Sequence, residues 1–429
     1  MSSLRVLESD ASLPQVRAAI ADTFAGGQPV APLPADPVTA PRVLAMLQPD
    51  EPVVEPDAAV IVSTSGSTGA PKGVVLSRAA IRASAEATHR RLGGPGRWLL
   101  ALPTHYVAGF MVVARATVAE TPVEEVGRDL AGLARAVAAT DLPTYLSLVP
   151  TQLARALDQP ELVTALQSVG AVLLGGAPAR PTLLRRSREL GITVLTTYGM
   201  SETCGGCVYD GEPLSGVEVG VDEPDSDGVG RILLGGPVAF SGYRLQPNLT
   251  ASTLLTEPRR ANVPGPPPCS GPLTPDSRRL PTAGQFAGAT PERRWVRTND
   301  RGRLIGARLE VLGRFDDVIV SGGLKIDLAA VERTARDWPA LGSGEIVMLG
   351  LPDREWGTRL VAFAETPSAG SVGADVTADL TALQDFLSGR VARHERPREL
   401  IMMPRLPRTS SGKVDRQRLL ADAIAEQQR

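Results

Sequence analysis

Residues 63–73 read Ser63-Thr64-Ser65-Gly66-Ser67-Thr68-Gly69-Ala70-Pro71-Lys72-Gly73 and carry the strongest signal in the sequence. The apolar run before them, residues 58–62, is typical of a buried strand. After them, residues 74–77 lead into an alanine-rich segment that we expect to be a helix capped by Ser77. Glycines let backbone N–H groups approach phosphate, hydroxyls add donors, and a lysine adds a point charge. The stretch therefore predicts a loop between a buried strand and a helix that binds the β- and γ-phosphates of ATP.

The sequence disfavours two other interpretations of this loop. A run rich in serine, glycine and threonine is often a flexible linker, but linkers seldom connect a buried strand directly to a helix. The stretch also differs from a Walker A loop, because Pro71 rather than glycine precedes Lys72 and no serine or threonine follows it.

Length and composition indicate a globular protein with more than one domain. The chain has 429 residues, 43% of them hydrophobic, and a net charge of −2. This balance gives no sign of a nucleic-acid partner or of an anionic membrane surface. Residues 1–10 lack the apolar core of a signal peptide, and Pro103, His105 and Arg115 interrupt the most apolar long stretch, residues 98–119. We therefore expect no membrane segment and a cytoplasmic location.

The cysteines indicate no disulfide framework. Cys204 and Cys207 form a C-x-x-C pair, but no second pair or nearby histidine completes a zinc site. We expect structural thiols and neither metal binding nor redox chemistry.

Lysine is rare in this chain, and its positions are informative. Of 45 lysine and arginine residues, only Lys72, Lys325 and Lys413 are lysines, and each lies in a loop that contains glycine. Lysine is a compact, mobile charge where arginine is a planar fork, so the two differ most at phosphates and reacting centres. The alternative is that these three lysines remain at their positions by chance. For Lys413 the alternative is a solvated charge near the end of the chain.

The periodicity predicts an α/β fold with a large N-terminal domain of mostly parallel sheets, a small β subdomain, and a small mobile α+β C-terminal domain. Strands are expected at residues 98–102, 144–149, 171–174 and 193–197 in the first part, and at 217–219, 230–234, 239–243 and 303–312 in the β subdomain. Helices are expected at 13–24, 41–47, 77–92, 108–119, 129–139, 151–157 and 180–190. We place the domains at residues 1–313 and 314–429, with the hinge near Asp316. Residues 257–294 are rich in proline and glycine, and we expect a flexible surface insertion, with a binding role as the alternative.

Further motifs follow the loop in order. They are Gly175-Gly176-Ala177-Pro178, Thr196-Thr197-Tyr198-Gly199-Met200-Ser201-Glu202-Thr203, Thr298-Asn299-Asp300-Arg301-Gly302, the segment from Gly313 to Ile326, and the Lys413 loop. Their order and spacing over residues 58–416 resemble the acyl- and aryl-adenylating superfamily, which includes acyl-CoA synthetases, peptide-synthetase adenylation domains and luciferases. One departure is Asn299-Asp300, where Gly-Asp is usual, and it retains the carboxylate.

The resemblance implies ATP and coenzyme A as substrates, Mg²⁺ as the metal, and a role for each matching residue. It places pyrophosphate at Ser63, Thr64, Ser65, Gly66, Ser67, Thr68, Gly69 and Lys72. It places the adenine pocket at Gly175, Gly176, Ala177, Thr197, Tyr198, Gly199 and Met200. Ribose would contact Asp300 and Arg314, the α-phosphate would lie near Thr203, and Glu202 would hold Mg²⁺. Lys413 would be the catalytic lysine of adenylation, Asp316 the hinge, and Gly322, Gly323 and Lys325 the border of the thiol tunnel.

A narrower resemblance concerns the acid. Residues 102–110, 147–153 and 203–211 are similar to the o-succinylbenzoate–CoA ligases of menaquinone biosynthesis. The resemblance implies that His105, Gly109 and Gly199 border the acid and that His105 takes part in catalysis. We also hypothesise that Arg115 faces a second carboxylate of the substrate. The alternatives are a structural His105 and an Arg115 that pairs with an acidic neighbour.

Other functions remain open at this point. The chain could be a ligase for another aryl or short acyl acid, a non-catalytic nucleotide-binding scaffold, or a phosphate-loop kinase or NTPase. Lys72, Glu202, Asp300, Arg314 and Lys413 together disfavour the scaffold. The expected partners are a small aryl acid and coenzyme A, with neither nucleic acid nor membrane, and a homodimer is left open.

Overall fold

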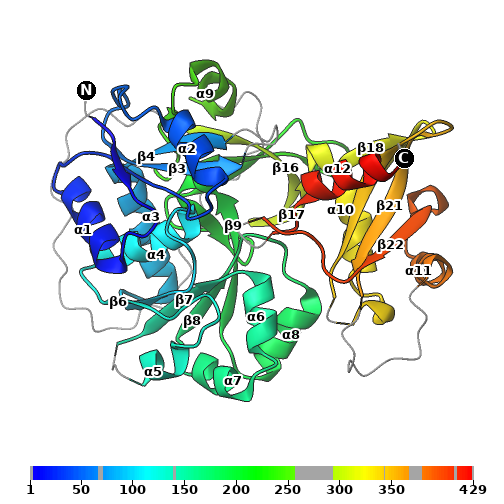
Figure 1. The fold of residues 1–429 in the computed structure, drawn as a ribbon, viewed down its shortest axis with the longest axis horizontal. Helices are drawn as coiled ribbons and strands as arrows, with labels where there is room; N and C mark the ends of the chain where they lie inside the picture. Colours follow the sequence, from blue (N-terminus) through cyan, green and yellow to red (C-terminus); the bar gives the residue numbers. More distant parts are fainter. Residues whose placement is uncertain are drawn as a thin grey trace.

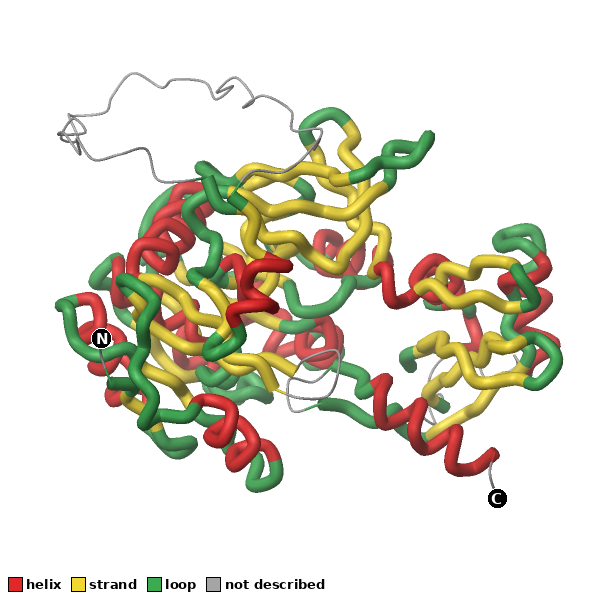
Figure 2. Tube along the Cα trace, turned by 90° about the horizontal axis from the view of Figure 1, so that it is seen from above, coloured by secondary structure: helices red, strands yellow, loops and turns green. Residues whose placement is uncertain are grey.

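The computed structural model describes residues 3–65, 71–138, 142–256, 293–342, 344–366, 379–409 and 413–427. A large unit of three sheets and their helices lies beside a smaller α+β unit that carries the C-terminus (Figure 1). The view from above shows the smaller unit at one side of the larger one (Figure 2). The predicted insertion lies almost entirely outside the described residues.

The first sheet has the order β1-β2-β3-β4-β14. Its strands are β1 (Arg5–Leu7), β2 (Val30–Pro32), β3 (Ala58–Ser65), β4 (Pro71–Ser77) and β14 (Gly242–Tyr243). β3 and β4 form an antiparallel hairpin in which Ser63 pairs with Gly73 and Thr64 with Lys72. The prediction that the glycine-rich stretch connects a strand directly to a helix is therefore wrong. Residues 74–76 are fully buried, and pairing their backbone with β3 satisfies groups that a loop would leave without partners.

The second sheet has the order β11-β10-β9-β8-β7-β5-β6. Its strands are β11 (Glu212–Pro213), β10 (Gly205–Tyr209), β9 (Val194–Met200), β8 (Ala171–Leu174), β7 (Thr144–Leu148), β5 (Arg97–Leu100) and β6 (Val123–Glu125). The strands from β6 to β9 are parallel, as predicted, whereas β10 and β11 are antiparallel. The loops after β8 and β9 therefore lie at the same edge, where ligands bind in such sheets.

Helices cover both sheets. They are α1 (Leu13–Phe24), α2 (Thr39–Leu47), α3 (Arg78–Leu92), α4 (Val107–Val118), α5 (Leu133–Val137), α6 (Pro150–Ala156), α7 (Pro160–Gln167) and α8 (Pro181–Glu189). Buried residues of α3 and α4 form one cluster with β3 and β4 on one side and β5 and β10 on the other. Ser77 caps α3 as predicted, because its side chain accepts a hydrogen bond from the Ala80 N–H.

One helix is shorter than predicted. α5 begins at Leu133, whereas the sequence pattern predicts a start at Asp129. The Asp129 carboxylate accepts a hydrogen bond from the Ala131 N–H, and Leu130 has a positive φ of 65°. Such a local side-chain bond competes with helix formation, so residues 129–132 form a turn.

The third sheet has the order β12-β13-β16-β15, with β17 paired to β16. Its elements are β12 (Glu218–Asp222), β13 (Gly230–Gly235), β15 (Leu254–Leu255), β16 (Trp295–Ile305) and β17 (Arg308–Arg314), with helix α9 (Pro247–Thr253) before β15. The strand expected at residues 239–243 is only partly formed and is not part of the third sheet. Its last two residues form β14 and pair with β4 in the first sheet, which brings Tyr243 toward the glycine-rich loop.

The smaller unit follows β17. It contains η2 (Phe315–Asp317), β18 (Val318–Ser321), β19 (Leu324–Asp327), α10 (Leu328–Ala335), η3 (Pro339–Leu341), β20 (Ile346–Asp353), β21 (Gly357–Glu365), α11 (Leu380–Leu387), η4 (Arg393–Glu395), β22 (Glu399–Met403) and α12 (Arg416–Gln427). β18 and β19 form a hairpin, and β20, β21 and β22 form a sheet with a buried cluster on each face. The buried clusters of the large unit extend to Leu309, and those of the small unit start at Ile326. The domain boundary near residue 313 stays a prediction.

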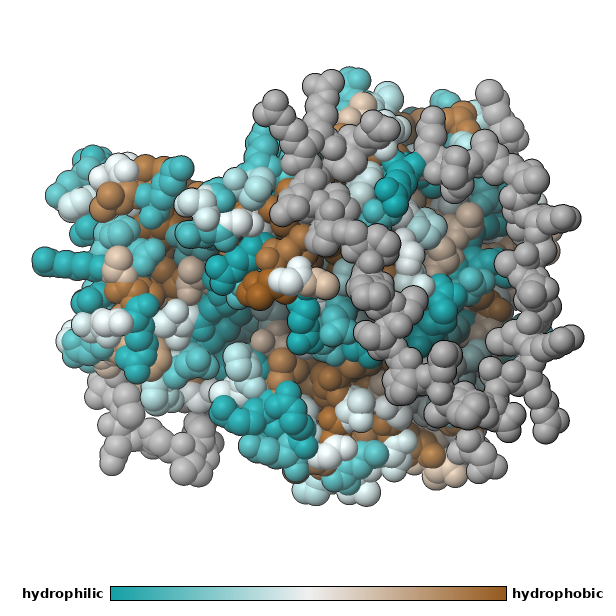
Figure 3. Space-filling view, turned by 180° about the vertical axis from the view of Figure 1, so that it is seen from behind, coloured by the Kyte–Doolittle hydropathy of each residue, from teal (hydrophilic) through white to brown (hydrophobic). Residues whose placement is uncertain are grey.

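Hydrophilic and hydrophobic side chains are interspersed on the face seen from behind (Figure 3). None of the helices in the described part of the chain is long and apolar enough to span a bilayer.

Candidate active site

The glycine-rich hairpin supplies the first side of the site. Ser63 is buried, and the backbones of Thr64 and Ser65 pair with those of Lys72 and Pro71. The Lys72 ammonium lies 5.8 Å from the centre of the Tyr243 ring, within the range of a cation–π contact. Residues Gly66, Ser67, Thr68 and Gly69 lie outside the described residues, so their role in phosphate binding stays a prediction.

The loop after β8 supplies the second side. A Cβ atom at Gly175 would come within 2.4 Å of the Thr197 hydroxyl, so this position requires glycine. Gly176 has a φ of +82°, and a Cβ there would lie 3.9 Å from Cε of Lys413 in the smaller unit. Ala177 follows on the exposed edge. The structure therefore brings Gly175, Thr197 and the catalytic-lysine candidate together.

Tyr198 and Asp300 connect the second and third sheets. The Tyr198 hydroxyl donates a 2.7 Å hydrogen bond to Oδ2 of Asp300. Burial, and next the negative charge of Asp300, raise the pKa of Tyr198 well above its ordinary value, so the phenol remains a donor. The other oxygen, Oδ1, lies 3.9 Å from Nη1 of Arg314. This arrangement orients the carboxylate of Asp300 and leaves Oδ1 able to accept a hydrogen bond from a sugar hydroxyl.

Glu202 is the candidate metal ligand. Its carboxylate is buried, and Oε1 accepts a 2.7 Å hydrogen bond from the Tyr243 hydroxyl. Burial raises the pKa of Glu202, while Tyr243 and the charge of Lys72 act in the opposite direction. Among the described residues, no group of three or more histidine, cysteine, aspartate or glutamate side chains is arranged to hold a metal ion. One buried carboxylate beside a phosphate-binding loop fits Mg²⁺, which is typically held by one or two carboxylates together with substrate phosphates.

The turn from Gly199 to Thr203 is tightly constrained. A Cβ at Gly199 would meet the Gly205 carbonyl oxygen at 2.2 Å. The Thr203 hydroxyl accepts from the Met200 N–H at 3.0 Å and lies 2.8 Å from the Gly205 carbonyl oxygen, to which it can donate. In this conformation the Thr203 hydroxyl therefore shapes the turn. Its position beside the α-phosphate stays a prediction, and the same turn contains Glu202.

Lys413 lies beside Asp300 and Arg314. Its side chain keeps an exposed surface, yet protein atoms surround it, and this desolvation lowers the pKa of its ammonium. The charge of Arg314 lowers that pKa further, and Asp300 partly offsets the effect. Arg314 also donates to both oxygens of Asp316, at 2.8 and 2.9 Å. Burial alone would raise the pKa of Asp316, but these bonds and the charge of Arg314 lower it below its ordinary value.

Gly322, Gly323 and Lys325 belong to a different surface. They lie in the β18-β19 hairpin, where the Gly322 N–H donates to the Trp356 carbonyl at 3.0 Å. A Cβ at Gly322 would come within 2.5 Å of the Trp356 ring. The contacts of Gly322 are thus with Trp356 of the smaller unit, apart from the group around Lys413. The role of the hairpin at a thiol tunnel stays a prediction.

His105 lies at a cavity of about 250 Å³ that is enclosed by the end of β5, the segment after β6 and the N-terminal strands. Burial, with Arg128 as a further cause, lowers the pKa of His105 to about 4. The imidazole is therefore neutral at pH 7, and its buried Nε2 has no hydrogen-bond partner among the residues that the structure describes. These properties suit a residue that packs against an aryl group.

Gly109 and Arg115 both lie on α4. A Cβ at Gly109 would meet the Pro103 carbonyl oxygen at 2.2 Å, so glycine lets the helix pack against the loop before it. Arg115 is only 4% exposed, and its guanidinium lies 5.1 Å from the centre of the Trp98 ring. Among the described residues no ion pair involves Arg115, and its Nε lacks a partner. The alternative of an acidic neighbour therefore finds no support in the part of the chain that the structure describes.

Cys204 and Cys207 are buried, unpaired thiols at the start of β10. Burial raises the pKa of both, that of Cys207 to about 12, so neither forms a reactive thiolate at neutral pH. This supports the prediction of structural thiols.

Sequence reasoning missed Tyr243, the hydrogen-bond donor to Glu202. Tyr243 stands 41 residues after Glu202, in a two-residue strand that is recognised only from its pairing with β4. No local signal reveals this contact, because a strand of two residues has no periodicity.

Comparisons with known proteins agree with this geometry. The chain matches the AMP-binding enzyme family over residues 5–244 and the AMP-binding enzyme C-terminal domain over residues 343–413. It is 38% identical over 383 residues to the probable 2-succinylbenzoate–CoA ligase of Mycobacterium tuberculosis, covering 86% of this chain and 85% of that protein. It is 28% identical over 396 residues to the 2-succinylbenzoate–CoA ligase of Enterococcus faecalis, covering 85% of this chain and 69% of that protein.

Solved structures share the fold. ATP-bound MatB from Rhodopseudomonas palustris aligns with a TM-score of 0.77 at 20% identity, covering 99% of this chain and 89% of that one. The o-succinylbenzoate CoA synthetase (MenE) from Bacillus subtilis, in complex with the acyl-adenylate OSB-AMP, aligns with a TM-score of 0.67 at 24% identity, covering 97% and 82%. These matches confirm the predicted α/β fold class, and together with the family matches they show that the chain belongs to the AMP-binding enzyme family.

Proposed function

We propose that this protein ligates o-succinylbenzoate to coenzyme A in menaquinone biosynthesis, through an acyl-adenylate and with release of AMP and pyrophosphate. The observation that carries the proposal is the reach of Lys413 from the smaller unit to Gly176, beside Asp300 and Arg314. The proteins of M. tuberculosis and E. faecalis that resemble this chain along most of its length are named for this acid. They support the choice of substrate.

The first step requires stabilisation of negative charge. The carboxylate of the acid attacks the α-phosphorus of ATP, the bond to the bridging oxygen breaks, and pyrophosphate leaves. Negative charge spreads over the α-phosphate and the bridging oxygen, where a fixed cation stabilises it. Lys413 would supply that cation, and Lys72 would bind the departing pyrophosphate. Mg²⁺ held at Glu202 would neutralise further phosphate charge when bound.

The second step forms the thioester. The thiol of coenzyme A attacks the acyl carbon, AMP leaves, and the thiol proton goes to solvent or to a base. We propose that the smaller unit rotates about Asp316 between the two steps, which brings Gly322, Gly323 and Lys325 to the site in place of Lys413. Such hinge motions often set the turnover rate. Because ATP and coenzyme A are cytoplasmic metabolites, we place the reaction in the cytoplasm.

The acid site would lie between α4 and the turn that contains Gly199. His105 would pack against the aryl ring as a neutral imidazole. Arg115 carries a buried positive charge for which the described residues offer no carboxylate. A substrate with a second carboxylate would supply that partner. Arg115 is not among the residues that line the cavity at His105, so the choice of a dicarboxylic acid rests on the relatives named for that acid.

A coupled assay for AMP tests the proposal. We expect sustained release of AMP only when o-succinylbenzoate, ATP and coenzyme A are all present, whereas the release of pyrophosphate in the first step requires only the acid and ATP. Benzoate and short acyl acids are the comparison substrates, and higher kcat/KM with one of them would replace the proposed acid. ADP as the nucleotide product would indicate a kinase, and nucleotide binding without turnover of any acid would indicate a scaffold. A homodimer stays a prediction that light scattering tests.

A further inference from the structure

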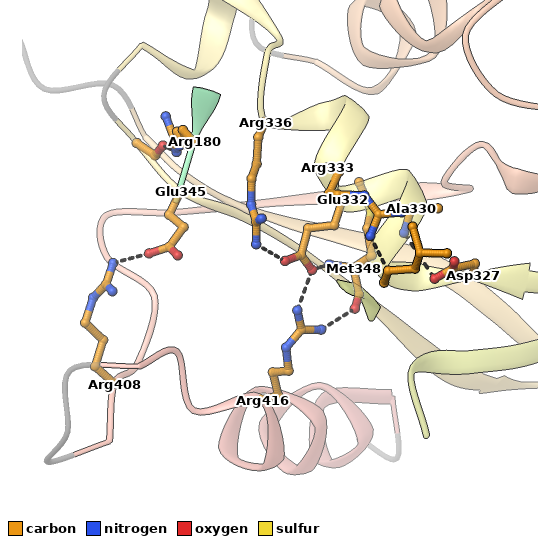
Figure 4. Close-up of polar contacts among 12 residues, drawn as sticks. Arg180, Asp327, Ala330, Glu332, Arg333, Arg336, Glu345, Met348, Arg408 and Arg416 are labelled. Carbon is orange, nitrogen blue, oxygen red and sulfur yellow. Dashed lines mark hydrogen bonds and ion pairs between the residues drawn. The ribbon is translucent and has the colours of Figure 1, made fainter. Parts of the chain in front are cut away.

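Arg180 of the larger unit bonds to the smaller unit (Figure 4). It is the residue before α8, and its guanidinium donates to the carbonyl oxygen of Gly344 and, at 3.5 Å, to that of Gly342. Burial lowers the pKa of this guanidinium, and acidic residues of the smaller unit, Glu345 foremost among them, act in the opposite direction. A part-buried hydrogen bond from a charged donor is among the stronger polar contacts in proteins.

The segment that receives Arg180 also anchors the loop of the catalytic-lysine candidate. Glu345 follows Gly344 directly, and its Oε2 lies 2.6 Å from Nη2 of Arg408. Arg408 also contacts Glu365 at 3.1 Å and pairs with Val414 in a β-bridge. Lys413 lies inside the loop that this bridge closes.

The other end of the loop is fixed as well. Arg416, three residues after Lys413, contacts Oε2 of Glu332 at 2.5 Å and the Met348 carbonyl oxygen at 3.0 Å. Arg336 holds Oε1 of the same glutamate at 2.5 Å. Figure 4 shows Arg336 and Arg416 on either side of Glu332, with Arg408 bonded separately to Glu345. The described residues on both sides of Lys413 are thus attached to the smaller unit, and Lys413 reaches Gly176 only when that unit is docked.

We propose that Arg180 is a positioning residue for acid activation, which holds the carbonyl groups of Gly342 and Gly344 and thereby keeps Lys413 at the nucleotide. The proposal rests on the proposed function, in particular on a first step that uses Lys413. Arg180 itself contacts main-chain carbonyls of the smaller unit, and the proposal requires no contact between Arg180 and substrate. Its loss should slow acid activation and spare acyl transfer to coenzyme A, for which the smaller unit leaves this position.

The test separates the two half-reactions in the full-length protein. Acid-dependent exchange between ATP and pyrophosphate measures the first, and thioester formation from chemically prepared acyl-adenylate measures the second. For Arg180→Ala we expect the exchange kcat to fall about tenfold or more, since small displacements of a catalytic group are costly. The KM values for ATP and acid should stay within about twofold, because the lost contact acts on the transition state. The thioester rate should equal that of the wild type.

Two further variants sharpen the result. Arg180→Lys keeps the charge and should restore part of the exchange rate. Arg186→Ala is the matched control, because Arg186 lies on the same helix but contacts Asp158 at 2.9 Å and the Leu157 carbonyl at 2.7 Å, both in the larger unit. It should leave both half-reactions unchanged. Glu345→Gln should show the same split as Arg180→Ala, and the double variant should lose less than the product of the two effects.

Three outcomes would overturn the proposal: equal losses in both half-reactions, a change confined to the KM for ATP, or no change in Arg180→Ala. Failure of the proposed function looks different, because the wild-type protein would then exchange pyrophosphate with an acid other than o-succinylbenzoate. The Arg180 test is run with whichever acid supports exchange. If no acid supports exchange, both the proposal and the proposed function are wrong.

Discussion

The hydroxyl of Tyr198 donates a 2.7 Å hydrogen bond to Oδ2 of Asp300 and so connects two motifs that stand about a hundred residues apart. The bond uses one carboxylate oxygen and directs the other toward the face where Arg314 and Lys413 lie. The adenine and ribose contacts that the family resemblance implies therefore depend on each other.

Tyr198→Phe should weaken ATP binding. A hydrogen bond to a charged group contributes about 1.5–3 kcal/mol, so we expect the KM for ATP to rise about tenfold or more. Tyr145→Phe is the control, because the Tyr145 hydroxyl donates to carbonyls of Leu92 and Gly94 away from the site. It should lower stability without changing the KM for ATP. An unchanged KM in Tyr198→Phe would remove the Tyr198–Asp300 pair from the nucleotide site.

Arg115→Ala should raise the KM for o-succinylbenzoate. If Arg115 pairs with the second carboxylate, loss of that charge-assisted contact should cost about tenfold or more in KM. A monocarboxylic analogue is the control substrate, and its KM should be the same in both proteins. Equal changes for both acids would show that Arg115 acts through the packing of Trp98 and not through charge.

Asp316→Pro should separate the two half-reactions in the opposite sense from Arg180→Ala. Proline fixes φ and so restricts rotation at the predicted hinge. We expect pyrophosphate exchange to persist and thioester formation to fall. Asp316→Ala is the control for the lost hydrogen bonds to Arg314, at 2.8 and 2.9 Å. Equal loss of both steps in Asp316→Pro would place the hinge elsewhere.

Acid should destabilise the fold through His89 and His105. Burial lowers the pKa of His89 and of His105 to about 4, from an unfolded value near 6.5. Between these values the unfolded chain binds more protons than the folded one, so the free energy of unfolding falls as the pH drops from about 6.5 to about 4. His89→Gln should flatten this dependence in urea unfolding experiments. The same slope as in the wild type would mean that other groups cause it.

The sequence predicted the parallel order of the strands from β6 to β9 but not all of the local structure around the candidate site. Strand–helix alternation placed the loops after β8 and β9 at one edge, because parallel strands end together, and this brought Gly175 and Tyr198 into the same site. The same reasoning misjudged residues 71–77, which pair with β3 as β4. By periodicity alone, a short apolar run before a helix can be either a buried strand or a buried part of the helix.

Contacts between distant segments were beyond the sequence. Tyr243 reaches Glu202 through a two-residue strand, and Arg180 reaches Gly344 across 164 residues. Arg180 follows the Gly175–Pro178 motif at the start of a predicted helix, and Tyr243 ends a predicted strand, but neither pattern identifies the distant residue that the side chain contacts. Arginine is also the common cation of this chain, so an arginine at position 180 is not unusual, whereas the scarce lysines pointed to Lys72 and Lys413 directly.

Pyrophosphate exchange by Lys413→Gln tests the central claim most directly. If the Lys413 ammonium stabilises the charge that develops at the α-phosphate, the variant should lose about 10²–10³ in the exchange rate, while it converts prepared acyl-adenylate to thioester at the wild-type rate. Lys325→Gln, which removes the other lysine of the smaller unit, should leave the exchange rate unchanged. Exchange at full rate in Lys413→Gln would contradict the account.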